Sequence, residues 1–266
     1  MDNRPIGVFD SGIGGLTVVS AMTKIFPSEV FLYLGDTARV PYGNKSREKI
    51  QQYAIEIASW LVKNECKLII VACNTASSYA LNLLKKQFEI PVLGVIDPGV
   101  KRAIRLTKNN AIGVLGTYGT IKSDAYGIAL KKTNKEITVI SQACPLFVPL
   151  VEEGWVNGSV PEEIAREYLA SIQRSEVDSI ILGCTHYPLL KTTIKKVLGE
   201  RINLVDSAEE TALEVKSILN KSKLYSSAGK EGQVLCHVTD STNLFEFLAY
   251  RFIDAPIRKI SQVDIF

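Results

Sequence analysis

The sequence has few residues of the kinds that bind metals or form disulfides, and it has no long apolar run. Its five cysteines are widely spaced without a CxxC pair, and it contains two histidines. Neither a disulfide framework nor a zinc site is expected from this pattern. No window approaches the roughly 18 apolar residues of a membrane helix, and no apolar run of signal-peptide length follows the N-terminal charges. We therefore expect a cytoplasmic protein that does not associate with membranes.

Composition and charge indicate a globular protein that does not bind nucleic acid. The chain has 266 residues, of which 46% are hydrophobic, enough for one large α/β domain or two smaller ones. Lys and Arg exceed Asp and Glu by 31 to 28, a net charge of +3, and the basic residues are scattered rather than gathered in a block. Neither a Walker motif nor a G-x-S-x-G elbow is present.

Short apolar segments alternate with helical segments along the first hundred residues. Strands are predicted at Ile6 to Phe9, Val30 to Leu34, Leu68 to Ala72 and Val92 to Ile96. Helices are predicted to end near Phe26 and to span 45–64 and 75–88. Because most of these strands are continuously apolar, the alternation favours a parallel sheet covered by helices on both faces.

The next hundred residues repeat this order. Ile6-Gly7-Val8 recurs as Ile112-Gly113-Val114, Val40-Pro41 as Val148-Pro149, the run leading to Cys73 as the run leading to Cys184, and Asp97 as Asp206. The offsets lie between 106 and 111 residues. Four landmarks in the same order at nearly constant spacing predict two similar α/β units that face one another.

The residues after Asp206 have no counterpart in the first unit. They predict a helix over 208–220, a loop over 221–232 rich in Ser, Gly and Lys, a strand over 233–238, another helix and a last short strand. The absence of a long flexible linker predicts that the two units pack closely.

The two strand-end cysteines are the main candidates for chemistry. Cys73 follows the apolar run 68–72 and precedes a helix, and Cys184 follows a matching run at 180–182. A single cysteine in such a place is more often a core residue, which is how Cys66, Cys144 and Cys236 are interpreted. The repeat favours function for the other two. A helix N-terminus stabilises a thiolate and binds a substrate carboxylate, so each thiol is a candidate base or nucleophile.

Other polar residues follow strands at the same predicted edge, where α/β proteins bind ligands. Asp10 and Asp36 are candidates to bind a substrate ammonium or orient a cysteine, although capping a helix or loop is the commoner role of such residues. His186 is a candidate to tune Cys184 or act as an acid, whereas His237 is interpreted as structural. Glu152, which follows Pro149-Leu150-Val151 near the analogous edge of the second unit, is a further candidate and is opposite in role to Asp36 by the repeat.

The glycine-rich loop after Asp10 also suggests a dinucleotide site. Asp36 lies 22 residues beyond Gly14, near the spacing of the ribose-binding acid in that fingerprint. However, the G-x-G-x-x-G pattern that starts at Gly12 has Thr17 where the third glycine belongs. No cofactor is therefore expected.

Four motifs together resemble one family. They are FDSGIGGLTV at 9–18, GDTARVPYG at 35–43, VACNTAS at 71–77 and LGCTHYPLL at 182–190. With them the chain resembles, essentially from end to end, the glutamate racemases of the cofactor-independent aspartate/glutamate racemase superfamily. The resemblance implies a two-base racemisation of glutamate that uses no pyridoxal phosphate and supplies D-glutamate for peptidoglycan.

The resemblance also implies roles for individual residues. Cys73 would exchange the α-proton of the D-isomer with help from Asp10, and Cys184 that of the L-isomer with help from His186. Asp36 and Glu152 would be secondary catalytic candidates. The substrate contacts would be Asp10, Ser11, Tyr42, Gly43, Asn74, Thr75, Thr117, Thr120, Thr185 and His186.

The family's organisation further implies two domains and a homodimer. Residues 1–97 with 207–266 would form one domain and 98–206 the other, with the active site in the cleft between them. Two alternatives remain open at this point. The chain could catalyse a related reaction, as aspartate racemase or a maleate isomerase-like enzyme does, or it could be a non-catalytic protein that binds a small acid.

Overall fold

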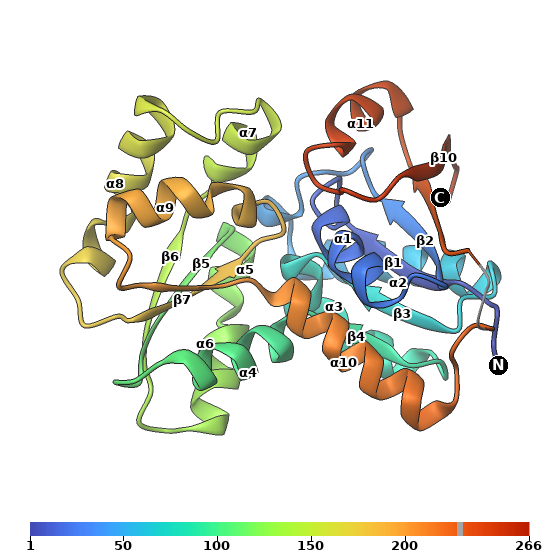
Figure 1. Ribbon diagram of the computed structural model, residues 1–266, viewed down its shortest axis with the longest axis horizontal. Helices are drawn as coiled ribbons and strands as arrows, with labels where there is room; N and C mark the ends of the chain where they lie inside the picture. The colour runs from blue at the N-terminus through green and yellow to red at the C-terminus, as the bar shows by residue number, and fades with distance from the viewer. Residues whose placement is uncertain (228–230, 266) are drawn as a thin grey trace.

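Two parallel sheets, each in its own lobe, form the framework of the molecule (Figure 1). The computed structural model describes residues 1–227 and 231–265. The larger sheet has the strand order β10-β9-β2-β1-β3-β4 and the smaller has β6-β5-β7-β8. Every described strand pairing is parallel. The predicted fold class, two mostly parallel α/β domains, is confirmed.

The larger sheet is built from the N-terminal strands and the C-terminal segment. Its strands are β1 (Ile6–Asp10), β2 (Val30–Gly35), β3 (Leu68–Val71), β4 (Val92–Gly94), β9 (Gln233–Val238) and β10 (Ile257–Gln262). Its helical segments are α1 (Leu16–Ile25), η1 (Tyr42–Asn44), α2 (Arg47–Lys63), α3 (Asn74–Gln87), α10 (Ser207–Ser222) and α11 (Thr242–Ala249). The central strands β1 and β3 are entirely buried, as continuously apolar sequences require.

The smaller sheet is built from the middle of the chain. Its strands are β5 (Ala111–Gly116), β6 (Thr138–Ala143), β7 (Ser179–Gly183) and β8 (Asn203–Val205). Its helical segments are α4 (Ile96–Leu106), α5 (Tyr118–Ser123), α6 (Ala125–Thr133), α7 (Phe147–Glu152), α8 (Ser159–Gln173), η2 (Tyr187–Leu190) and α9 (Lys191–Leu198). The central strand β5 is fully buried, whereas the edge strand β6 is partly exposed.

The two sheets share one topology. The order β2-β1-β3-β4 in the larger sheet corresponds to β6-β5-β7-β8 in the smaller, so the repeat in the sequence is a repeat in the fold. One landmark is not equivalent in structure. The Val40-Pro41 pair lies in an extended loop before η1, whereas Val148 and Pro149 lie inside α7. Strands β9 and β10 extend only the larger sheet.

Two predicted boundaries differ from the structure by two residues. The fourth strand stops at Gly94 rather than at Ile96, and α4 begins there with Asp97 and Pro98 in its first turn. Both residue types suit a helix start, since a carboxylate favours the positive end of the helix dipole and proline lacks only an N–H that has no helical partner there. Helix α10 extends to Ser222, two residues into the predicted loop 221–232, of which 228–230 lie outside the described residues.

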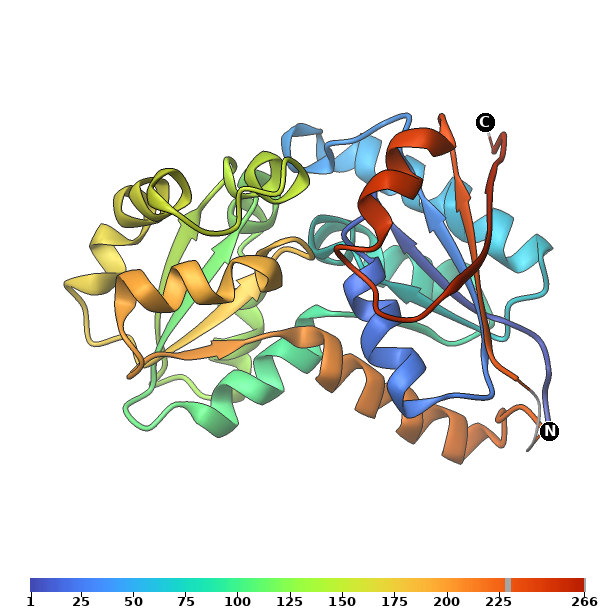
Figure 2. The same cartoon turned by 45° about the horizontal axis from the view of Figure 1, so that its top comes forward.

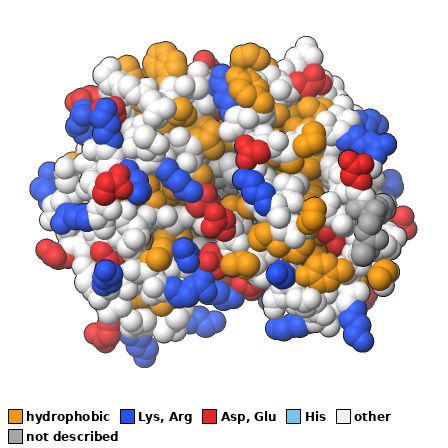
Figure 3. All heavy atoms as spheres, viewed as in Figure 1, with side chains coloured by type: hydrophobic (Ala, Val, Ile, Leu, Met, Phe, Trp, Pro, Cys, Tyr) orange, Lys and Arg blue, Asp and Glu red, His pale blue; other side chains and the backbone are white. Residues whose placement is uncertain are grey.

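The chain crosses between the lobes where α4 and α10 begin, and these helices pack against each other (Figure 2). Ion pairs link them: Lys101 Nζ lies 2.6 Å from Glu214 Oε2, and Arg105 pairs with Glu210. Over the face in Figure 3, basic and acidic side chains are interspersed. No helix of the described ranges is long and apolar enough to span a bilayer.

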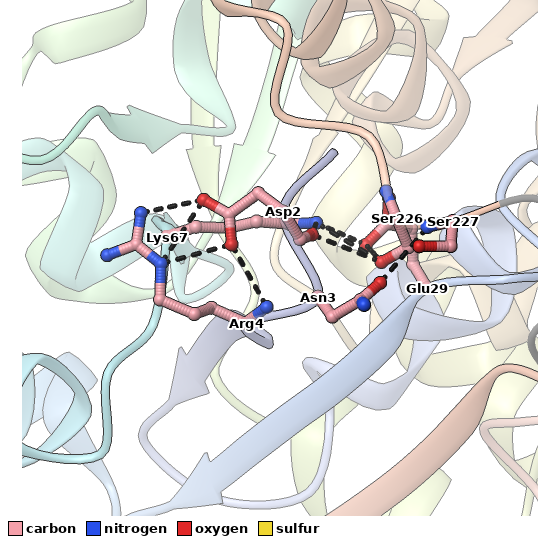
Figure 4. A network of polar contacts seen from close by, with 7 residues as sticks. All are labelled: Asp2, Asn3, Arg4, Glu29, Lys67, Ser226 and Ser227. Atoms are coloured by element: carbon pink, nitrogen blue, oxygen red, sulfur yellow. Dashed lines mark hydrogen bonds and ion pairs between the residues drawn. The ribbon is translucent and has the colours of Figure 1, made fainter.

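A buried polar network ties the N-terminus and the segment after α10 to the larger sheet (Figure 4). Lys67, just before β3, donates from Nζ to Glu29 Oε2 at 2.6 Å and to the backbone oxygen of Asp2 at 2.7 Å. Ser226 donates to the same carboxylate from its backbone N–H and its hydroxyl, both at 2.8 Å. The side chains of Lys67 and Glu29 are 0% and 2% exposed, so this ion pair lies in the protein interior.

Candidate active site

The register of the two sheets brings the predicted site residues to the carboxyl ends of neighbouring strands. In the larger sheet Asp10 pairs with Gly35, and Phe9 with Val71, so Asp10, Asp36 and Cys73 lie at one edge. In the smaller sheet Gly116 pairs with Gly183, which places Thr117 beside Cys184. Parallel strands end at the same edge, and the first residues after them therefore gather there.

Cys73 caps helix α3, as the sequence predicts for a thiol at a helix N-terminus. Its sulfur accepts a hydrogen bond from the backbone N–H of Ala76 at 3.5 Å and lies 3.7 Å from the Ser11 hydroxyl. Burial, the negative charge of Asp10 and Cys184 raise the pKa of Cys73 to about 12, and the contacts with Ala76 and Ser11 oppose this shift only partly. The Cys73 side chain is therefore a thiol at neutral pH, contrary to the thiolate that its helix position suggested.

Cys184 lies in a different local structure. The backbone after β7 forms the short η2 turn, with Pro188 at its start, and helix α9 follows directly from Lys191. The Cys184 sulfur lies 4.0 Å from Nδ1 of His186, and Nε2 of His186 lies 3.0 Å from Oε1 of Glu152. The thiol, the imidazole and the carboxylate thus form a chain of polar contacts.

His186 carries a proton at neutral pH. Burial opposes the charge, but the hydrogen bonds and the charges of Cys184 and Glu152 outweigh burial and raise the pKa of His186 to about 10. The imidazolium stabilises negative charge on the Cys184 sulfur. The two cysteines therefore have opposite electrostatic environments, a carboxylate beside Cys73 and a cation beside Cys184.

Asp10 connects the two halves of the site. Its carboxylate accepts the backbone N–H of Gly12 at 3.0 Å and the hydroxyl of Thr185, from the other lobe, at 3.4 Å. Burial raises the pKa of Asp10, while the charge of His186 and the N–H groups of the glycine loop limit the increase. A buried carboxyl with a raised pKa next to Cys73 can hold or release a proton there.

Asp36 makes its hydrogen bonds with residues other than the cysteines. Its carboxylate accepts hydrogen bonds from Thr239 Oγ1 at 2.9 Å, from Arg39 Nε at 2.7 Å and from the Tyr42 hydroxyl. Its Oδ2 thereby holds Arg39 and Tyr42 in the loop that leads to Gly43, and its Oδ1 accepts from Thr239, which follows β9. Asp36 therefore contacts Arg39 and Tyr42, whereas Glu152, which the repeat sets opposite Asp36, contacts His186.

Four predicted binding residues that carry hydroxyl or amide groups lie where the lobes meet: Asn74, Thr75, Thr117 and Thr120. Thr75 Oγ1 lies 2.9 Å from Thr117 Oγ1 and 3.1 Å from Thr120 Oγ1, which joins the N-termini of α3 and α5. Asn74 Oδ1 accepts the hydroxyl of Tyr126 at 2.6 Å. Asn74 and the three threonines thus make two neighbouring sets of hydrogen bonds that bridge the lobes.

Glycines make the close contact between the lobes sterically feasible. A Cβ on Gly14 would lie 2.2 Å from Thr185 Oγ1 and 2.5 Å from His186 Nδ1, and one on Gly43 would lie 2.8 Å from Thr117 Cβ. The backbone itself therefore approaches the opposite lobe at both places. Cys73 and Cys184 are only 6% and 7% exposed as a result of this enclosure.

Such an arrangement suits the transfer of a proton at carbon. Two thiols lie near enough for one to affect the pKa of the other, and each has its own titratable partner. The described ranges contain no group of His, Cys, Asp and Glu suited to hold a metal ion.

Sequence reasoning missed several neighbours of the site. Arg39 lies inside the GDTARVPYG motif, which was a usable signal for it. Tyr126, Thr239 and Phe252 come from segments without any motif, and Phe252 contacts the ring of His186. Their proximity arises only from the tertiary fold.

Comparison with known proteins identifies the family. The family model Asp/Glu/Hydantoin racemase matches residues 10–215. The glutamate racemase of Geobacter metallireducens is 48% identical over 98% of this chain and 97% of its own length. Among solved structures, a glutamate racemase from Francisella tularensis in complex with D-glutamate is 40% identical, with a TM-score of 0.94 over 100% of this chain and 99% of that one.

A glutamate racemase isoform from Bacillus anthracis gives the same TM-score of 0.94, at 39% identity over 99% of this chain and 98% of that one. The likeness thus extends over both lobes and through all four motifs. This chain belongs to the Asp/Glu/hydantoin racemase family and is an amino-acid racemase.

Proposed function

We propose that this enzyme interconverts L- and D-glutamate by proton transfer between two cysteines, without a cofactor. The observation that carries the proposal is the placement of Cys73 and Cys184 at equivalent strand ends of two sheets with the same strand order. Glutamate as the substrate is supported by full-length relatives that are glutamate racemases, one of them solved in complex with D-glutamate.

In this mechanism one thiolate removes the α-proton, and the electron pair of the broken C–H bond remains on the α-carbon and its carboxylate. The other thiol donates a proton to the opposite face, so a new C–H bond forms and no oxidation occurs. An α-proton beside a carboxylate is very weakly acidic, which makes fixed geometry and preorganised donors necessary. The N–H groups at the start of α3 and the threonine hydroxyls are suited to that task.

The two cysteines have distinct roles in each direction. Cys184 is next to the His186 cation and is suited to remove the proton of L-glutamate, while Cys73, with its raised pKa, is suited to donate. For D-glutamate the roles reverse, and Asp10 takes the proton of Cys73. Ser11, Tyr42, Gly43, Asn74, Thr75, Thr117, Thr120 and Thr185 are the proposed substrate contacts.

The biological setting follows from the product. We propose that the enzyme supplies D-glutamate for peptidoglycan in the cytoplasm and that it works as a homodimer. We assign residues 1–97 and 207–266 to one domain and 98–206 to the other, with the substrate bound between them. Asp36 and Glu152 contribute from outside the reacting pair, Asp36 by holding the 41–44 loop and Glu152 through His186.

The test is isotope exchange together with paired cysteine variants. In deuterated water the enzyme should introduce deuterium at the α-carbon of glutamate, with aspartate assayed in parallel. Cys73→Ser and Cys184→Ser should each lower kcat at least about a hundredfold, as loss of a catalytic proton-transfer group does. Cys66→Ala, a change at a buried cysteine outside the site, is the control. Wild-type turnover in either serine variant would contradict the two-base mechanism, and an unexchanged α-proton would indicate a binding protein instead.

A further inference from the structure

The C-terminal segment, which has no counterpart in the repeat, contacts the Cys184 half of the site. Strand β9 and helix α11 belong to the lobe of the larger sheet, and Figure 1 shows α11 on the same side of the molecule as α7. Two consecutive residues after α11, Arg251 and Phe252, reach elements of the other lobe. Each touches a different member of the Glu152–His186 pair.

Arg251 supports the end of α7. Its guanidinium donates from Nη1 to the backbone oxygen of Glu152, the last residue of the helix. Two residues later Gly154 has a φ of +79°, and a Cβ there would lie 3.0 Å from Nη1 of Arg251. The guanidinium also lies 5.5 Å from the ring centre of Phe247 and 5.8 Å from that of Tyr250, which restrict its position. The turn after α7 is therefore shaped around Arg251.

Phe252 supports the imidazole. Its ring centre lies 5.2 Å from that of His186 with an angle of 77° between the planes, an edge-to-face contact. Phe252 is 4% exposed, so the contact is part of the interior. His186 is thus held by the ring of Phe252, by the carboxylate of Glu152 and by the sulfur of Cys184.

The partner of Cys73 is held by different contacts. This partner, Asp10, is fixed by the end of β1, by N–H groups of the glycine loop in the same lobe and by the hydroxyl of Thr185 from the other lobe. The two halves therefore differ in their supporting contacts as well as in charge, because only the Cys184 half is contacted by Phe252 and Arg251 in the ways described above.

We propose that Arg251 and Phe252 are positioning residues that fix Glu152 and His186, and thereby the proton transfer at Cys184, without touching the substrate. The inference rests on the proposed two-cysteine racemisation. It predicts that loss of either residue slows the transfer at Cys184 and leaves the transfer at Cys73 unchanged.

The test compares Phe252→Leu, Arg251→Met and the conservative Arg251→Lys with the control Asp254→Asn. Asp254 lies two residues further along the same segment and pairs with Lys24 at the surface. For each variant kcat/KM is measured in both directions, together with the isotope effect of α-deuterated L-glutamate and of α-deuterated D-glutamate. Thermal unfolding shows which variants are folded, and if Phe252→Leu is not, Arg251→Met decides.

The two substrates are enantiomers of equal free energy, so kcat/KM must fall equally in both directions, by about tenfold for a misplaced catalytic group. The isotope effects should separate. With α-deuterated L-glutamate the labelled step occurs at Cys184 and becomes more rate-limiting, so its isotope effect rises. With α-deuterated D-glutamate the labelled step occurs at Cys73 and becomes less rate-limiting, so its isotope effect falls.

Arg251→Lys, which can still donate to the Glu152 backbone, should restore part of the activity, and Asp254→Asn should match the wild type. Isotope effects that stay unchanged, or that move in the same direction for both isomers, would overturn the inference. If the wild-type enzyme racemises glutamate but the isotope effects do not separate, only this inference fails. If the wild type does not racemise glutamate, the proposed function fails.

Discussion

The ion pair between Lys67 and Glu29 allows a prediction about the stability of the larger lobe. In Lys67→Met the Glu29 carboxylate loses the ammonium group at 2.6 Å and keeps only the two contacts from Ser226. Because the two side chains are 0% and 2% exposed, water cannot replace the lost partner. Removing one member of a buried pair costs about 3–5 kcal/mol, so we expect a loss of that size in the free energy of unfolding.

Two further variants test whether the loss of stability comes from leaving one buried charge without its partner. In Lys67→Met/Glu29→Met both charges are absent, and although the Ser226 N–H loses its acceptor, the double variant should be more stable than Lys67→Met alone. Lys24→Met removes one member of a surface pair whose side chains are 66% and 80% exposed. Exposed pairs contribute about 0–1 kcal/mol, so this control should change stability little.

The assay is equilibrium unfolding in urea followed by tryptophan fluorescence. The sequence has two tryptophans, Trp60 in α2 of the larger lobe and Trp155 in the smaller. A Trp155→Phe background therefore makes the signal specific to the lobe that holds Lys67. If Lys67→Met cost less than about 1 kcal/mol, like the surface control, the reasoning that this pair is buried and uncompensated would be refuted.

Three other results are expected. Asp36→Asn removes the charge that holds Arg39 and the loop before Gly43, so KM for glutamate should rise about tenfold with a smaller change in kcat. An unchanged KM would show that Asp36 does not position this loop for substrate binding. The pKa of His186 is raised from 6.5 to about 10, so its contribution to stability is fully present below pH 6.5 and declines above it. Between about pH 7 and 10 the free energy of unfolding should therefore fall by up to about 1.4 kcal/mol per pH unit. Urea titrations of His186→Gln at several pH values should lack this decline. A Cβ on Gly119 would lie 2.9 Å from Thr75 Cγ2, so Gly119→Ala should lower kcat/KM about tenfold while its unfolding midpoint stays near that of the wild type.

Much of the framework follows from local sequence patterns. The strand before Cys73 was predicted at 68–72 and is observed at Leu68–Val71, because a short, continuously apolar run suits a strand of a parallel sheet that is covered on both faces. The repeat predicted a second lobe with the same strand order. The repeat was a weaker guide to the role of a carboxylate in each lobe. Glu152 contacts His186, whereas Asp36 contacts Arg39.

The remaining parts of the site depend on contacts between distant segments. The Arg251 contact with Glu152 joins residues 99 positions apart, and no spacing rule relates them. The state of Cys73 was also beyond local reasoning. A helix N-terminus favours the thiolate, but burial and the adjacent Asp10 act in the opposite sense and raise the pKa of that thiol.

The shared strand order of the two sheets has a consequence for handedness. Enantiomers are mirror images, but a chain of L-amino acids cannot build the mirror image of its own lobe. Duplication supplies two lobes of the same hand, so the approaches to the two faces of a carbon atom are at best alike and never identical. The unequal surroundings of Cys73 and Cys184 are one expression of this limit. The two isomers are present in equal amounts at equilibrium because they have equal free energy, not because the enzyme is symmetric. An enzyme built from L-amino acids reaches that equilibrium through two halves that differ.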